Sequence, residues 1–164
     1  MTVASHTWSL PEQVNLPPDL AAFRGRTFIL YHPTTPPLAR AIREGQAFRK
    51  LRGHAESVAV LIWALRPFPP PSAAVKEVFR QAFADGPQID AAAWVVDTEL
   101  VMGTSIVRSI STQVFGDGVP TSFFRDPFDA AAWLESLGAG EAREILSGLE
   151  ELDRATPDAR FNLG

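Results

Sequence analysis

The sequence has 164 residues, of which 46% are hydrophobic and 21% are charged, and it contains no cysteine. This length and apolar content fit one compact domain with a full core and argue against a disordered chain. The lack of cysteine excludes disulfides and thiolate metal sites. The net charge is −4. No apolar run is long enough to span a membrane. With no evident signal peptide, we expect a cytoplasmic location.

The charges are unevenly divided along the chain. Residues 1–84 hold ten Arg and Lys against five Asp and Glu, whereas residues 85–164 hold five against fourteen. A nucleic-acid binder usually has a dominant basic field, and here the basic residues gather only in 40–54, so we expect no nucleic acid. The asymmetry could steer a charged partner, or the basic stretch could simply be a solvated helix face.

The first half of the chain alternates between strand-like and helix-like spacing. TFILYH (27–32) is short and rich in aromatic and β-branched residues, which predicts a strand. VAVLIWAL (58–65) lacks polar alternation, as expected of a central strand covered on both faces. Between them, 36–51 predicts a helix with these residues on its inward face: Leu38, Ala41, Ile42, Gly45 and Phe48.

A helix, a third strand and another helix follow. A helix is predicted over 72–86, capped by Ser72 and ended by Gly86. DAAAWVVD (90–97) predicts a strand whose small alanine face lets a helix approach closely, and 101–116 predicts the next helix.

PTSFFR (120–125) predicts a fourth strand, and the residues after it mark the start of a helix. Asp126 is the expected cap, with Pro127 at the first helical position. Apolar spacing then points Trp133 at the core, and Gly138 ends the helix.

The two ends of the chain leave alternatives open. The closing segment 141–155 is amphipathic, and it could dock on the domain or pair with a second copy to form a homodimer. In the proline-rich lead segment, HTWSL (6–10) could add an edge strand, and 16–25 could form one or two helical turns.

The resulting β-α-β-α-β-α-β-α order predicts an α/β fold. We expect a single domain with a mostly parallel four-stranded sheet, to which an N-terminal edge strand could be added. The expected division is a lead segment (1–26), an α/β domain (27–137) and a C-terminal helix and tail (138–164).

Residues 91–134 resemble the closing part of STAS-like (SpoIIAA-like) domains, and FFRDPFDAAAWL carries the resemblance most strongly. More diffusely, the likeness extends over 27–137. It implies a small, mostly parallel sheet with helices packed against it, acting as a regulatory or binding module and not as an enzyme. Antagonist-type members carry a phosphorylated serine in a DSSG-like turn. Here Ser72, Ala73 and Ala74 fall in that turn, so we do not expect that switch, and we interpret Ser72 as a helix cap.

In α/β sheets, ligands usually bind beyond the carboxyl ends of the strands. His32, Arg66 and Asp97 could together bind a small anion or act as an acid–base set. Polar residues also occur at strand ends simply because the core finishes there. The full set of candidate ligand- or partner-binding residues is His32, Thr34, Arg66, Ser72, Asp97, Thr98 and Arg125.

No catalytic, metal or cofactor site is predicted. The three histidines share no ligand spacing, and no serine lies in a nucleophile-elbow motif. GDG (116–118) and GAG (138–140) lack the strand–turn–helix setting of a phosphate loop.

The leading hypothesis is a non-enzymatic regulatory or interaction module that docks a protein partner through a helix face or the strand-end loops. Its candidate surfaces are the basic helix with Arg40, Arg43 and Arg49, the corner RPFPPPS (66–72) with Phe68, and the acidic helix 141–154. The alternative is a sensor or carrier of a lipid, nucleotide or anion.

Overall fold

The computed structural model describes residues 14–64, 71–96 and 101–156, and of 101–104 and Ile106 it describes only the backbone. The strands are β1 (Ala22–Arg24), β2 (Thr27–His32), β3 (Ser57–Ala64), β4 (Gln88–Val95) and β5 (Thr121–Phe124). The helices are α2 (Leu38–Lys50), the short 3-10 helix η1 (Leu51–Gly53), α3 (Ala73–Asp85), α4 (Val101–Phe115), α5 (Pro127–Ser136) and α6 (Ala142–Ala155).

The α/β fold is confirmed, and the four predicted strands are β2 to β5. They pair in parallel, in the order of the chain, and β1 adds a fifth, antiparallel strand at one edge.

Of the one or two helical turns expected over 16–25, one forms before the chain extends into β1. In that turn the N–H groups of Leu20 and Ala21 donate to the carbonyl of Pro17, at 2.9 and 3.2 Å. Gly25 then adopts a φ of +59°, which a two-residue hairpin turn requires and which glycine adopts without strain. The predicted edge strand, 6–10, lies outside the described residues.

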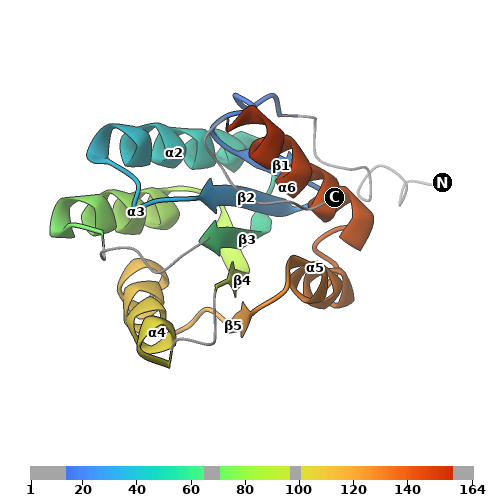
Figure 1. The fold of residues 1–164 in the computed structure, drawn as a ribbon. Helices are drawn as coiled ribbons and strands as arrows, with labels where there is room; N and C mark the ends of the chain where they lie inside the picture. Colours follow the sequence, from blue (N-terminus) through green and yellow to red (C-terminus); the bar gives the residue numbers. More distant parts are fainter. Residues whose placement is uncertain (1–13, 65–70, 97–100, 157–164) are drawn as a thin grey trace.

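The sheet lies between two layers of helices (Figure 1). Because strand order follows chain order, right-handed crossovers place α2, α3 and α4 on the same face. Helices α5 and α6 follow the last strand and cover the other face, with α6 on β1 and β2 and α5 on β4 and β5.

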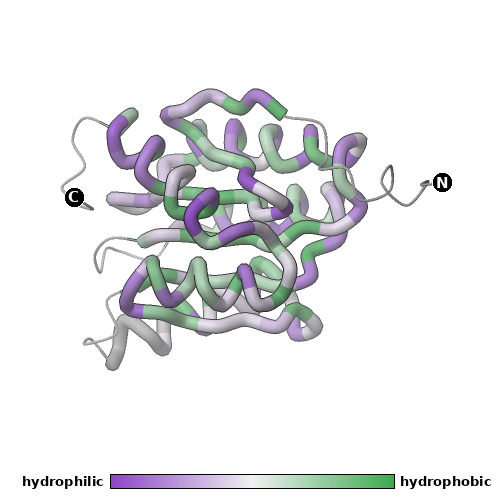
Figure 2. The backbone as a smooth tube through the Cα atoms, turned by 90° about the vertical axis from the view of Figure 1, so that its right-hand side faces the viewer, coloured by the Kyte–Doolittle hydropathy of each residue, from purple (hydrophilic) through white to green (hydrophobic). Residues whose placement is uncertain are grey.

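Each face of the sheet has its own buried core. The central strand β3 is buried from Val58 to Ala64, as predicted for a strand covered on both faces. Alternate side chains along the strands point to opposite cores. Phe28, Leu30 and Val60 join the core under α2–α4, and Ile29, Tyr31 and Leu61 join the core under α5 and α6. In Figure 2 the helices change between hydrophilic and hydrophobic along their length, as amphipathic helices do.

The start of α5 has the predicted geometry. Asp126 accepts a hydrogen bond from the N–H of Phe128 at 2.8 Å, and Pro127 is the first helical residue. Ala130 and Ala131 are buried in the same core as Ala91 and Ala93 of β4. Trp133 is only half-buried and packs on the Phe124 ring, at 5.6 Å between centroids.

Helix α6 docks on its own domain, so its apolar stripe is not available for a dimer. Ile145, Leu149 and Leu152 are at most 1% exposed. A Cβ on Gly148 would lie 2.8 Å from Cδ1 of Ile29, so the absence of a side chain there lets the helix lie close against the sheet. None of the helices described has the length and apolarity needed to cross a bilayer.

Candidate functional site

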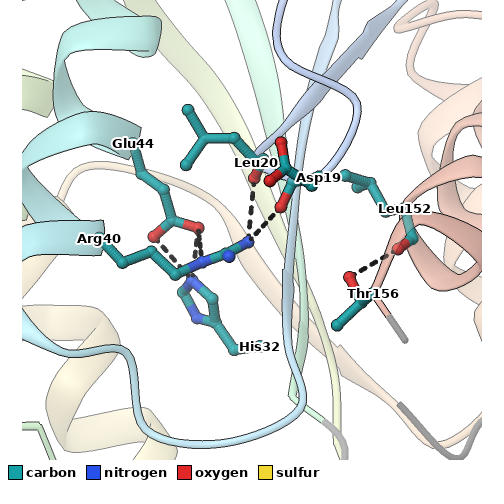
Figure 3. A network of polar contacts seen from close by, with 7 residues as sticks. All are labelled: Asp19, Leu20, His32, Arg40, Glu44, Leu152 and Thr156. Atoms are coloured by element: carbon teal, nitrogen blue, oxygen red, sulfur yellow. Dashed lines mark hydrogen bonds and ion pairs between the residues drawn. The ribbon is translucent and has the colours of Figure 1, made fainter. Parts of the chain in front are cut away.

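Three ionisable side chains meet at the carboxyl end of β2 (Figure 3). The Nε2 atom of His32 lies 2.9 and 3.1 Å from the two carboxylate oxygens of Glu44, which projects from α2. The Nε atom of Arg40, one helical turn earlier, donates to Oε2 of Glu44 at 3.3 Å. The Glu44 side chain is fully buried and that of His32 is 8% exposed. A buried ionisable side chain is costly unless it is paired, and the contacts with His32 and Arg40 provide that pairing for Glu44.

Arg40 connects this cluster to the lead segment. Its terminal nitrogen donates to the backbone carbonyls of Asp19 at 3.1 Å and Leu20 at 3.4 Å (Figure 3). The guanidinium group therefore joins α2 to the turn before β1. Arg40, predicted as part of a partner-binding face, is instead largely engaged inside the domain.

A small cavity of about 60 Å³ lies beside His32, between the sheet and helices α3 and α4. Its wall is mainly apolar and includes Phe79, whose ring centroid is 6.0 Å from that of His32. Trp94 also lines it, but its indole N–H donates to the hydroxyl of Ser111 at 3.0 Å. His32 and Lys76 are therefore the polar side chains that the described part of the wall offers a ligand.

The other predicted strand-end residues do not join His32 in one site. Thr34 is exposed, and Arg125 is exposed after β5, three strands from β2, or about 14 Å across the sheet. The strand order never reverses, so the crevice that forms at a reversal in other α/β sheets is missing from the described sheet. Arg66, Phe68, Asp97 and Thr98 lie outside the described residues.

Ser72 is a helix cap, as interpreted from the sequence. Its hydroxyl accepts a hydrogen bond from the N–H of Val75 at 3.2 Å, at the start of α3.

Helix α2 is turned differently from the prediction, which placed Leu38 and Ile42 inward. Both are exposed, at 44% and 41%. Ala41, Gly45 and Phe48 are buried as predicted, and Gly45 faces α3, where an added Cβ would lie 3.0 Å from Cβ of Ala82. The same rotation buries Glu44 against His32. We call the exposed side chains of α2 the α2 outer face: Leu38, Ala39, Ile42, Arg43, Gln46 and Lys50.

Arg49, the third predicted contact residue on α2, lies at the border of this face. It is bonded to Asp85 of α3 at 3.2 Å, so its charge is partly matched within the domain. Arg43 and Lys50 are the more available cations.

A larger hollow, about 680 Å³, lies between the lead segment and α6. Its charged residues are Arg24, Arg143, Glu144 and Glu151, and Arg24 is paired with Glu151. With two acids and two bases, it has no net charge to select a ligand.

Sequence reasoning missed Glu44, although a signal for it was present. Glu44 stands three residues after Ala41 and four before Phe48, both of which were placed on the inward face. That spacing puts Glu44 on the same face, but only a buried partner such as His32 explains an acid there.

In residues 14–64, 71–96 and 101–156, no three side chains of metal-binding type lie together. Comparisons with protein-family models, curated proteins and solved structures give no match. Inferences about function therefore depend on the residues of this chain.

Proposed function

We propose that the protein is a non-enzymatic regulatory interaction module whose α2 outer face binds an acidic, partly apolar protein segment. One observation carries the proposal: Leu38 and Ile42 stand one turn apart, 44% and 41% exposed, beside the exposed cation Arg43. Paired large aliphatic side chains at i and i+4 can anchor an amphipathic helix of a partner.

The charge of this face indicates the kind of partner. The only acid of α2 is Glu44, and it is buried and bonded to Arg40. The exposed side chains of the helix are therefore apolar, neutral or basic, with Arg43 and Lys50 as the cations. An acidic segment with apolar anchors complements such a face and is steered to it.

A second copy of this chain is the less suitable occupant. Its acidic amphipathic helix, α6, has Ile145 and Leu149 buried against its own sheet, so those side chains cannot reach the α2 outer face. The proposed kinship with STAS-like domains supports a regulatory class of function, because such domains act as binding modules. A cytoplasmic location, in keeping with the cysteine-free sequence, is part of the same proposal.

Site-specific photo-crosslinking tests the proposal. A photoreactive phenylalanine analogue replaces Ile42 in one variant and the exposed Ala132 of α5 in a matched control. In cells of the native host, we expect a discrete adduct from position 42 and none from position 132. No adduct at position 42, or an adduct of two copies of this chain, would overturn the proposal.

The charge requirement has its own test. Arg43→Glu combined with Lys50→Glu should reduce the adduct at position 42 at least tenfold and leave thermal unfolding nearly unchanged, because both side chains are exposed. Arg143→Glu, on the exposed side of α6, is the control and should leave the adduct intact. An adduct that survives the double charge reversal contradicts an acidic partner.

A further inference from the structure

We infer that the cavity beside His32 binds a short-chain monocarboxylate, such as propionate, with the carboxylate bound to His32 and Lys76. This site is separate from the α2 outer face, and it does not depend on the partner proposed above.

His32 presents one free nitrogen atom. Its Nε2 is held by Glu44, and within the described residues no group bonds its Nδ1. The residue is 93% buried, at 7% exposure, and it lines the cavity. A buried carboxylate that fixes one ring nitrogen orients the other toward a ligand, as carboxylate–histidine pairs do at metal and catalytic sites.

The balance of charge around the cavity favours an anion. Glu44 is offset by Arg40, whose guanidinium group is always protonated. Lys76 on α3 lines the same cavity and is half-buried, and its ammonium group has no hydrogen bond or ion pair within the described residues. A carboxylate next to Lys76 and His32 would therefore supply a charge that the site lacks.

The size of the cavity and its wall define the rest of the ligand. A water molecule needs roughly 10–15 Å³ of cavity volume, so about 60 Å³ accommodates about four to six non-hydrogen atoms. Phe79, Trp94 and Ile110 form apolar parts of the wall, which suits a short hydrocarbon chain. A nucleotide or a long-chain lipid could not be enclosed.

The charged side chains that contact His32 or line the cavity in the described structure are Glu44 and Arg40 from α2 and Lys76 from α3. A carboxylate bound in the cavity would accept a hydrogen bond from the Nδ1 side of the His32 ring and one from the Lys76 ammonium group.

The wild-type protein can be tested directly with propionate and with propionamide, which has the same shape and no charge. We expect propionate to shift the NMR signals of the Ile62, Ile110 and Val114 methyl groups at millimolar concentration, and propionamide to bind at least tenfold more weakly. Equal binding of the two ligands, or no shifts with propionate, would each overturn the inference.

Variants then assign the residues. Lys76→Met should weaken propionate binding at least fivefold, whereas Lys50→Met, on the α2 outer face, should not change it. His32→Gln should weaken propionate binding as well. If His32→Gln does not fold, the wild-type ligand pair and Lys76→Met still decide the matter. Unchanged binding in Lys76→Met contradicts the assigned charge pair.

Discussion

Substituting Gly86 by alanine tests how tightly α2 and α3 are locked together. Gly86 follows α3 with an extended backbone (φ −87°, ψ −162°), so alanine meets no backbone strain there. Its Cβ, however, would lie 2.2 and 2.4 Å from two ring atoms of Phe48. That ring is fully buried and packs edge-on against Phe28 and Phe83, with centroids 5.2 and 4.9 Å apart, so it cannot turn without disturbing both.

The magnitude follows from two opposing effects. Overpacking a core typically costs about 1–3 kcal/mol, and contacts this short favour the upper end. Replacing glycine by alanine stabilises by about 0.4–1 kcal/mol, because the unfolded chain loses freedom. We therefore expect a net loss of about 2 kcal/mol, which lowers the melting temperature by about 4–8 °C for a domain of this size.

Thermal unfolding followed by circular dichroism measures the effect. Gly118→Ala is the matched control, because nothing lies within 4 Å of its added Cβ and its φ is not in the left-handed region. It should melt as wild type or slightly higher. In a double-mutant cycle, Phe48→Leu should destabilise the Gly86→Ala protein less than it destabilises wild type. Equal melting of Gly86→Ala and wild type would refute the reasoning.

Three further predictions concern α6, the α3 cap and the buried tyrosine. Leu149→Ala, at a fully buried position of α6, should cost about 2–5 kcal/mol in urea unfolding, and a loss no larger than that of half-buried Leu146→Ala would contradict the docking of α6. Ser72→Ala should cost about 1 kcal/mol through loss of the cap, whereas exposed Ser147→Ala should cost almost nothing. Burial, and then the charge and hydrogen bond of Asp153, raise the pKa of Tyr31 above its usual value. The folded state therefore holds this proton longer, so stability is fully present below about pH 10 and falls as the pH rises further. Tyr31 is the only tyrosine, so ultraviolet absorbance should show it titrating at higher pH in the folded protein than in urea, and coincident titrations would disprove this.

The candidate site shows the limit of reasoning from sequence. His32 was singled out because it ends a strand, and the structure gives it a cavity and a fixed orientation. Its partner Glu44 was not, because an acid within a basic stretch looks like part of a solvated face. Leu38 and Ile42 were placed inward because they are apolar and fit the helical spacing, although the structure exposes both. Helical spacing gives relative positions around an axis, but the rotation of the helix depends on what it packs against.

The sequence by itself determined the local structure of this protein. Strands β2 to β5 and the helices between and after them could be predicted from the sequence. The signals were the spacing of apolar residues, helix caps such as Asp126 and Ser72, and glycines at helix ends, and each of these depends only on neighbouring residues. Tertiary structure alone decided that Gly25 closes a hairpin onto β1, that α2 turns Glu44 toward His32, and that α6 returns to cover the first strands. The contacts of α2 and α6 join residues that are not neighbours in the chain, and the energies of all three depend on the shapes and charges that meet, which no local pattern contains.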